Sequence, residues 1–232
     1  MDRLSGVGVL DKSVAVMEVL AESGPSSLAQ LVAATGLARP TVHRLALALE
    51  AHGLVGRDER GRFRLGMRLA AWGHRVGRAL PVVAHAGPAL ADLRDATGES
   101  AQLYVRDGDQ RVCVAVAERP AGLRDTVPVG ARLALTVGSG AKALLAWADP
   151  AGWPPGVQAA GLAAVRRAGW AASVAEREAG VASVSAPVRD RAGSVIAAIS
   201  VSGPIDRLGR RPGVRFGPAV LAAAHALEAR LA

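Results

Sequence analysis

Residues 27–66 limit the fold of this chain more than any other segment, because they combine two short helical patterns, a tight turn and a basic hairpin. Ser27 and Gln30 have the spacing of a capping box, in which two side chains bind the unpaired N–H groups at a helix start. Gly36 can adopt the left-handed conformation that ends a helix, and Pro40 suits the first turn of the next one. The segment therefore predicts a helix-turn-helix.

The second of these helices has two different faces. Its apolar face is expected to pack on the preceding helices and consists of Val42, Leu45, Ala46 and Leu49. A rotation of about 100° per residue places Arg44 almost opposite that face. Arginine can bind guanine or phosphate, threonine can contact phosphate or a thymine methyl group, and a helix N-terminus attracts phosphate. The residues of this helix predicted to contact DNA are Arg39, Thr41, His43 and Arg44.

A short hairpin is predicted next, with the turn-rich residues 58–61 between its strands. Phe63 and Leu65 share one face of the second strand, so this face can dock while arginines on the other face reach the sugar-phosphate backbone. Arginines on a two-stranded ribbon can also form only a solvated face, and it is the preceding helices that favour a DNA-binding wing. The arginines predicted to contact DNA from the wing are Arg57, Arg62 and Arg64.

The chain resembles the IclR family of bacterial transcription regulators in two regions. In the first region, the resemblance to the family's N-terminal domain is carried by residues 36–45, 52–55 and 62–66. In the second region, three stretches resemble in order the signatures of the family's effector-binding domain, and they are residues 138–145, 180–188 and 200–204. The resemblance implies an α+β protein with an N-terminal winged helix-turn-helix and a C-terminal GAF-like effector-binding domain built on an antiparallel sheet.

The length of 232 residues suits one small and one larger domain. We expect a DNA-binding domain at residues 1–66, a linker helix at 67–80 and an effector-binding and oligomerisation domain at 81–232. Residues 67–78 are helical in pattern and free of proline, and a helical linker is semi-rigid. Its apolar residues can cover the wing, pair with the same helix of a second protomer, or do both.

The C-terminal domain is expected to be an antiparallel-centred α+β domain, because locally paired strands are surrounded by helices. Asp107, Gly108 and Asp109 form a turn signal within one predicted hairpin, and residues 190–193 form another. The predicted strands are 101–105, 111–117, 181–188 and 194–202. The predicted helices are 82–97, interrupted at Gly87 and Pro88, and 140–148, 162–168 and 218–231, with a loop at 149–156.

A candidate pocket lies on the second predicted hairpin. Alternation places serines of both strands on faces that can line a cavity, although such serines often bind local backbone groups instead. The resemblance implies effector contacts from Ser139, Gly140, Ser183, Ser200 and Ser202, and also from Ser173 and Val181. The loop at 138–140 could donate N–H groups to a carboxylate, so an amino acid or a carboxylate metabolite is the expected effector class. Ala141 and Ser173 depart from the usual residues of the family.

Composition excludes several other classes of protein. Cys113 is the only cysteine, so neither an intrachain disulfide nor a cysteine-based zinc site can form, and its apolar strand predicts a buried, inert thiol. The five histidines are scattered, and no metal, cofactor or catalytic motif is present, so we expect no enzyme activity. No apolar run could cross a bilayer, which predicts a cytoplasmic protein without membrane contact. The net charge of +8 favours an anionic partner, although a membrane surface or plain solubility would also explain it.

These expectations combine into a metabolite-controlled regulator that binds double-stranded DNA as a homodimer or a tetramer. A dimer would recognise a near-palindromic operator. Residues 98–104 and 118–130 resemble the actinobacterial branch of the family that controls amino-acid biosynthesis, including leucine-pathway genes. The alternative is a DNA-binding protein of the same fold whose C-terminal domain only oligomerises, without a ligand.

Overall fold

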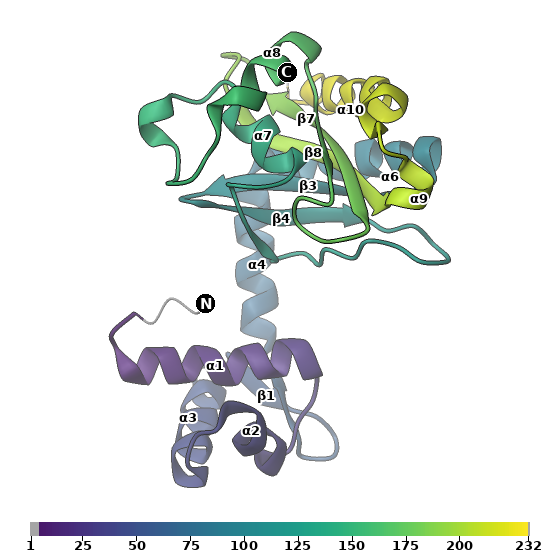
Figure 1. The fold of residues 1–232 in the computed structure, drawn as a ribbon. Coiled ribbons are helices and arrows are strands. Elements are labelled where there is room, and N and C mark those ends of the chain that lie inside the picture. Colours follow the sequence, from purple (N-terminus) through teal and green to yellow (C-terminus); the bar gives the residue numbers. More distant parts are fainter. Residues whose placement is uncertain (1–4, 232) are drawn as a thin grey trace. The chain divides into compact units, whose positions relative to one another are not determined.

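The structure is a computed structural model that describes residues 5–231, apart from the side chain of Arg78. The chain divides between Ala79 and Leu80 into two compact units, each of which is considered by itself (Figure 1). The first unit contains α1 (Gly8–Ser23), α2 (Leu28–Thr35), α3 (Arg39–Ala51), β1 (Val55–Arg57), β2 (Phe63–Leu65) and α4 (Met67–Ala79).

The first unit confirms the predicted start and end of α2. The Ser27 Oγ accepts from the Gln30 backbone N–H at 3.3 Å, and the Ser27 N–H donates to the Gln30 side-chain oxygen at 2.8 Å. Gly36 follows the helix with a φ of 66°, in the left-handed region that glycine favours. α1, α2, α3 and the hairpin share one apolar core, whose buried members include Val16, Leu20, Leu31, Val42, Ala46 and Phe63.

The second unit is built on one six-stranded antiparallel sheet in the order β5-β4-β3-β8-β7-β6. Its strands are β3 (Ser100–Asp107), β4 (Gln110–Ala117), β5 (Arg132–Ala134), β6 (Ala171–Val174), β7 (Val181–Arg189) and β8 (Val195–Pro204). Its helices are α5 (Pro81–Ala84), α6 (Ala86–Thr97), α7 (Ser139–Leu145), α8 (Leu162–Ala168), α9 (Ile205–Leu208) and α10 (Pro212–Glu228), with single 3-10 turns at Pro150–Gly152 and Ala159–Gly161.

Helices cover both faces of this sheet. On one face, α6 and α10 pack on residues such as Leu103 and Ile199. On the other face, α7 packs on the side of the sheet that carries Tyr104, Cys113 and Ala198, and α8 packs against α7. Neighbouring strand residues thus enter different cores, as the alternation of a β-strand requires. Both predicted hairpins are present, as β3 with β4 and β7 with β8.

Two predicted helices differ from the structure. The helix expected at 82–97 is broken at His85 rather than at Gly87 and Pro88. Pro88 lies in the first turn of α6, where its missing N–H would have no partner within the helix, so it does not interrupt the helix.

The strands β5 and β6, which have three and four residues, were not predicted, because such short segments carry little periodicity.

The last helix was predicted to begin at Pro218, but α10 begins at Pro212 and contains Pro218 in its interior. The reason is tertiary. A Cβ added at Gly213 would lie 1.9 Å from the Trp170 ring, and one added at Gly217 would lie 2.6 Å from its Nε1. The two glycines therefore form a notch that receives the Trp170 indole, and this packing outweighs the usual cost of an interior proline.

The notch predicts a reversal of the usual effect of alanine in a helix. Gly213→Ala should destabilise the protein because the new methyl group would overlap the Trp170 ring, although alanine is normally better than glycine in a helix by about 1 kcal/mol. Gly87→Ala in α6 is the matched control, because nothing lies within 4 Å of its added Cβ. Urea unfolding of both variants measures the difference, and a Gly213→Ala protein as stable as Gly87→Ala would contradict the notch.

Cys113 is buried in β4, as predicted, and burial raises the pKa of its thiol to about 11. The folded protein should therefore resist alkylation by iodoacetamide near neutral pH, whereas the urea-unfolded protein should react. As the pH rises above 9.0, the thiol's ordinary pKa, the unfolded chain loses this proton first, so the stability contributed by the neutral thiol declines until the pH passes about 11. Urea titrations across this range should show a steeper decline for the wild-type protein than for Cys113→Ala, and equal slopes would refute the assignment.

Candidate functional site

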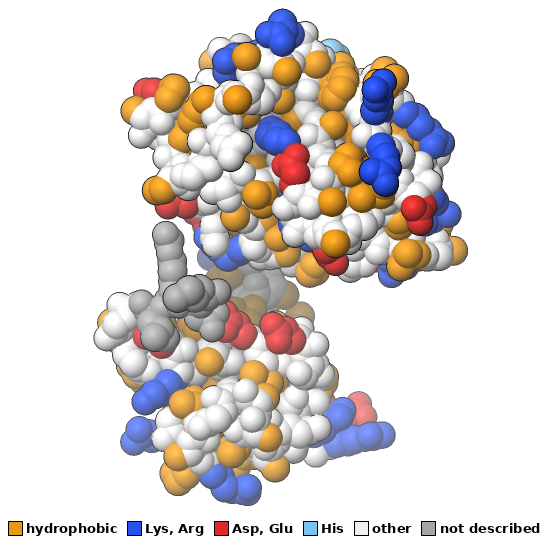
Figure 2. All heavy atoms as spheres, in the orientation of Figure 1, with side chains coloured by type: hydrophobic (Ala, Val, Ile, Leu, Met, Phe, Trp, Pro, Cys, Tyr) orange, Lys and Arg blue, Asp and Glu red, His pale blue; other side chains and the backbone are white. Residues whose placement is uncertain are grey.

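α3 presents a polar face on the surface of the first unit. Val42, Leu45, Ala46 and Leu49 are buried, so the predicted burial pattern of this helix is confirmed. The predicted contact residues on its other sides are the exposed Arg39, His43 and Arg44 and the half-buried Thr41. In the view of Figure 2, basic side chains lie over α3 and at the tip of the hairpin. An exposed helix face with basic side chains can enter the major groove of DNA.

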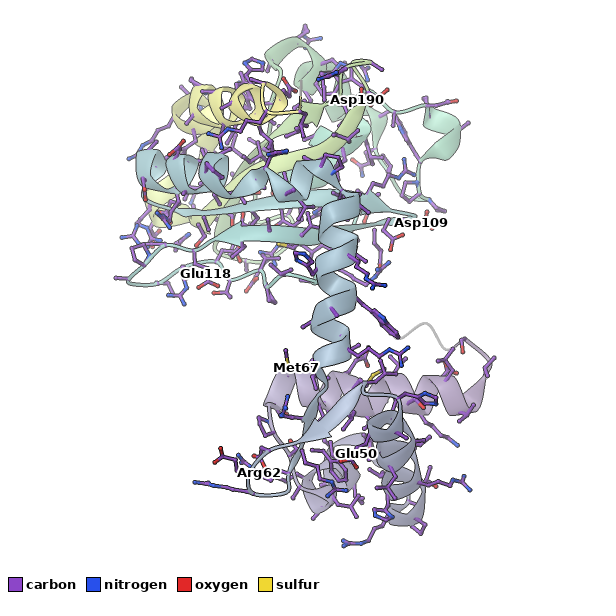
Figure 3. The ribbon with its side chains drawn as sticks, turned by 180° about the vertical axis from the view of Figure 1, so that it is seen from behind. Glu50, Arg62, Met67, Asp109, Glu118 and Asp190 are labelled. Atoms are coloured by element: carbon purple, nitrogen blue, oxygen red, sulfur yellow. The ribbon has the colours of Figure 1, made fainter. Side chains whose placement is uncertain are left out.

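Arg57 of the hairpin is held by contacts within the unit. Its Nε donates to the carboxylate of Glu50 on α3 at 3.0 Å, and its guanidinium lies 4.3 Å from the centroid of the Phe63 ring. Figure 3 shows the hairpin beside α3 and labels Glu50 and Arg62. Arg57 therefore fixes the hairpin to the helix, a role that the sequence did not suggest.

The other two hairpin arginines are also engaged. Arg62 Nε donates to Asp58 at 2.8 Å, and Arg64 donates to the backbone oxygens of Arg57 and Leu65 at 3.3 and 3.2 Å. A guanidinium has five N–H donors, and exposed ion pairs contribute only about 0 to 1 kcal/mol. These contacts thus orient the arginines without using up their ability to bind phosphate.

The second unit brings the predicted effector residues to one cavity. All seven of them line it, namely Ser139, Gly140, Ser173, Val181, Ser183, Ser200 and Ser202. They come from the start of α7 and from three neighbouring strands, β6, β7 and β8. The cavity has a volume of about 20 Å³, which is roughly the space of one water molecule. Its walls therefore nearly touch, and any metabolite-sized ligand requires them to move apart.

The serines form a directional chain of hydrogen bonds. Ser200 Oγ donates to the Val184 oxygen at 3.3 Å, and Ser185 Oγ donates to Ser200 Oγ at 2.8 Å. Ser139 Oγ lies 2.7 Å from both Ser185 Oγ and Ser183 Oγ. Because a hydroxyl has a single proton, Ser139 must donate to Ser185 and Ser183 must donate to Ser139. The protons of all these hydroxyls are used inside the chain.

The loop before α7 differs from its predicted role. The Gly138 N–H, which was expected to be available to a carboxylate ligand, donates to Glu176 Oε2 at 3.0 Å. Lys142 also pairs with Glu176. An internal carboxylate thus occupies one of the donors that the sequence assigned to the effector.

Arg111 of β4 is a site residue that sequence reasoning missed. It is only 3% exposed, lines the cavity and has its guanidinium 5.5 Å from the Tyr104 ring centroid. Burial lowers the pKa of Arg111, because removal from water disfavours the charged form. The available signal was alternation, since Arg111 shares a strand face with Cys113 and is the charged residue on that apolar face.

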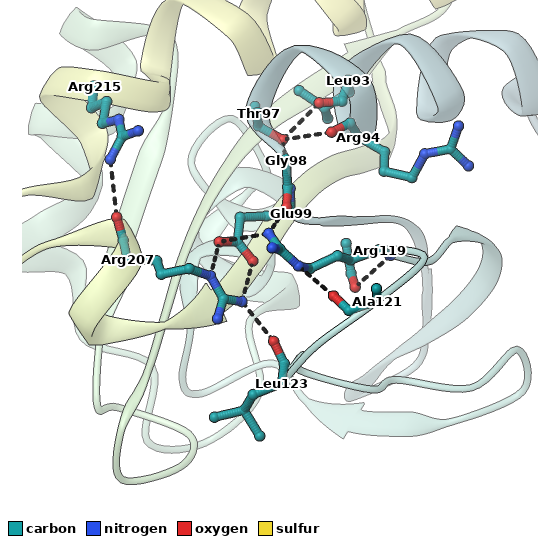
Figure 4. Close-up of polar contacts among 11 residues, drawn as sticks. Leu93, Arg94, Thr97, Gly98, Glu99, Arg119, Ala121, Leu123, Arg207 and Arg215 are labelled. Atoms are coloured by element: carbon teal, nitrogen blue, oxygen red, sulfur yellow. Dashed lines mark hydrogen bonds and ion pairs between the residues drawn. The ribbon is translucent and has the colours of Figure 1, made fainter.

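The loop between β4 and β5 is fastened at two points. Glu99 is 3% exposed and accepts from Arg207 at 2.5 and 2.7 Å, and the same arginine donates to the Leu123 oxygen at 2.7 Å (Figure 4). Farther along the loop, Asp125 accepts from Arg177 at 2.7 and 2.8 Å on the cavity wall. The second contact makes this loop one side of the cavity.

Among residues 5–231, no group of three or more His, Cys, Asp or Glu side chains is placed to hold a metal ion. Within the same range, none of the helices is both long and apolar enough to span a membrane.

Sequence comparison relates both units to known proteins. The family described as bacterial transcriptional regulator IclR C-terminal matches residues 74–153 and 158–229, and the IclR helix-turn-helix domain matches residues 9–59. The HTH-type transcriptional regulator BhcR of Paracoccus denitrificans is 29% identical over 242 aligned residues, which cover 96% of this chain and 87% of BhcR. The glycerol operon regulatory protein of Streptomyces griseus is 30% identical over 218 residues, which cover 86% of this chain and 85% of that protein.

A solved structure has the same fold. The IclR homolog of Microbacterium hydrocarbonoxydans complexed with 4-hydroxybenzoate gives a TM-score of 0.79 at 24% identity, and the match covers 96% of this chain and 98% of that one. The predicted fold class is thus correct, with a helix-turn-helix domain followed by an α+β domain on an antiparallel sheet. The matching families and relatives are transcriptional regulators and not enzymes, in agreement with the predicted absence of catalysis. The chain therefore belongs to the IclR family of bacterial transcriptional regulators.

Proposed function

We propose that this regulator binds a near-palindromic operator as a homodimer, with a tetramer as the larger alternative assembly. The observation that carries the proposal is the polar face of α3, which is exposed while its apolar stripe is buried. Two such helices would enter successive major grooves about 34 Å apart. Arg39, Thr41, His43 and Arg44 would read or clamp the groove, and Arg57, Arg62 and Arg64 would contact the flanking backbone.

Exposed apolar side chains in the first unit support self-association. Met67 and Val76 on α4 are 71% and 61% exposed, and Val9, Leu10 and Trp72 are exposed as well. Since these residues of α4 are not covered by the hairpin, we favour the pairing of α4 with its copy over the alternative that it only covers the wing. A paired helix is semi-rigid and could carry motion from the residues 81–232 domain to the DNA-binding domain.

The C-terminal domain, which we regard as GAF-like, would bind a small effector in the serine-lined cavity. The proposed contacts are Ser139, Gly140, Ser173, Val181, Ser183, Ser200 and Ser202. The Microbacterium hydrocarbonoxydans homolog forms a complex with 4-hydroxybenzoate, which supports a small-molecule effector for this protein. Control of DNA binding requires that the effector bind the two arrangements of the protein with different affinity. We expect an amino acid or a carboxylate metabolite.

The regulated genes are proposed from sequence resemblance alone. Residues 98–104 and 118–130 resemble the branch that controls amino-acid biosynthesis, so leucine-pathway promoters are the first operators to test. A protein that acts on chromosomal DNA works in the cytoplasm, which we propose as its compartment. The alternative function is a regulator whose C-terminal domain only oligomerises. Thermal shift separates the two, since a ligand at about 100 times its Kd adds about 2.7 kcal/mol of stability.

Fluorescence anisotropy tests the proposal directly. The purified protein is titrated into its own upstream DNA and into a scrambled duplex, across a series of salt concentrations. Specific binding that weakens steeply with salt supports the regulator. Equal, weak binding to both duplexes would mean that the protein does not bind its own promoter and would move the search to genome-wide operator selection.

Two arginines should affect DNA binding differently. Arg44→Ala is expected to weaken operator binding by roughly 1 to 3 kcal/mol and leave the scrambled duplex less affected, because Arg44 faces the groove. Arg62→Ala should weaken binding to both duplexes and reduce the salt slope by about 1, because a phosphate contact is lost. Arg167→Ala, an exposed arginine of α8, is the control for lost charge. An Arg44→Ala protein with unchanged operator affinity would contradict the proposed orientation of α3.

The cavity can be tested with two neighbouring serines of β7. Ser183 lines the cavity, whereas Ser185 belongs to the same hydroxyl chain without being part of the cavity wall. Ser183→Ala should abolish the change in anisotropy caused by a panel of amino acids and 2-oxo acids while operator binding persists. Ser185→Ala should lower thermal stability, because it interrupts the chain, and should retain the response. A Ser183→Ala protein that responds as strongly as Ser185→Ala and the wild-type protein would remove Ser183 from the effector contacts.

A further inference from the structure

Arg111 is a buried cation without a buried counter-charge. Its side chain forms no salt bridge with any described carboxylate, although arginines are seldom buried unless they are paired. Nη1 donates to the backbone oxygens of Ala134 and Val137, the latter at 2.9 Å. Carbonyl groups satisfy hydrogen bonds but do not neutralise a charge, and a buried unpaired charge is costly. Arg111 thus carries a positive charge that no described side chain neutralises.

The same side chain has an unused donor. Among residues 5–231, only two buried side-chain nitrogens have no hydrogen-bond partner, and one of them is Arg111 Nε. A Cβ at Gly138 would lie 3.1 Å from Arg111 Nη2, and one at Gly140 would lie 3.3 Å from Nε. Both glycines also line the cavity. Because neither residue has a side chain, no Cβ is present to press on the Nε and Nη2 edge of the guanidinium.

The other polar groups of the wall do not offer the same opportunity. Arg177, the second arginine of the cavity, already pairs with Asp125 at 2.7 Å and with Glu178 at 3.4 Å. The protons of the serine chain are used inside that chain, as its geometry requires. Arg111 is therefore the wall residue at which a ligand could gain most by bringing a negative charge.

We propose that Arg111 determines the specificity of the effector site by binding a carboxylate through Nε and Nη2. The planar fork of a guanidinium matches the two oxygens of a carboxylate, and such paired hydrogen bonds are shorter and stronger than neutral ones. The remainder of the effector then extends towards the serine-lined wall. The inference rests on the proposed function of the cavity and adds the residue that reads the ligand's charge.

The test compares carboxylates with their neutral amides. Acetate, isovalerate and benzoate are each compared with acetamide, isovaleramide and benzamide by thermal shift and calorimetry on the full chain. At least one carboxylate should bind about tenfold or more tightly than its amide, which corresponds to about 1.4 kcal/mol. The inference is overturned if every carboxylate binds the wild-type protein no more tightly than its amide does. It is also overturned if no carboxylate stabilises the wild-type protein more than it stabilises Arg111→Gln.

Three variants assign the preference to Arg111. Arg111→Gln should lose the preference for the carboxylate, and Arg111→Lys should keep it with weaker binding, because lysine retains the charge without the planar fork. Arg191→Gln removes an exposed arginine from the β7–β8 turn and should behave as wild type. If circular dichroism shows that Arg111→Gln is unfolded, Arg111→Lys and the wild-type amide comparison still decide the result.

Operator binding by the same proteins separates this inference from the proposed function. If Arg111→Gln still binds the operator but no longer responds to carboxylates, the result supports both the role of Arg111 and the proposed function. If the protein binds no operator but prefers carboxylates in a way that depends on Arg111, the inference is upheld and the proposed function is refuted. An operator response to carboxylate that is unchanged in Arg111→Gln refutes the inference and upholds the function.

Discussion

The second unit depends on the position of β8, which pairs with β3 on one side, through residues 198–202, and with β7 on the other side, through residues 195–204. This pairing joins segments about a hundred residues apart, as in the hydrogen bond at 3.0 Å from the Gln102 side chain to Ser202. Alternation along β8 sends Ile199 and Val201 into the core under α6 and α10 and leaves Ser200 and Ser202 on the cavity side. A shift of one residue would exchange these sets, so the core specifies the cavity.

Around the cavity, charge is distributed unevenly. Two ion pairs hold the loop between β4 and β5, one between Glu99 and Arg207 and the other between Asp125 and Arg177. Removing one partner of such a buried pair is costly, because the other charge remains without compensation. Arg111 is the exception on this wall, because no described carboxylate pairs with it. The cavity wall therefore carries a positive charge that no described side chain neutralises, and the proposed carboxylate would supply the opposite charge.

In the first unit, the hydrophobic core and the surface charges have separate tasks. The core positions α3 so that its polar face remains exposed, and this depends on the burial of apolar side chains, which the screening of charges by salt does not weaken. The hairpin arginines are held by exposed contacts that salt and phosphate can replace. Such an arrangement keeps the wing basic and oriented while leaving its interactions weak enough to exchange for DNA.

The sequence by itself determined the local elements. The capping box at Ser27, the left-handed Gly36, the stripe of α3 and the turn signals of both hairpins depend on neighbours within a few residues, so they could be recognised from spacing. Family resemblance added the serines of the cavity. Tertiary structure alone decided three other features. They are the notch at the start of α10, the hydrogen bond from the Gly138 N–H to Glu176, and the place of Arg111 in the cavity wall. Their partners lie tens of residues away in the chain, and only the packing of the sheet and helices brings these groups within a hydrogen bond or a van der Waals contact of one another.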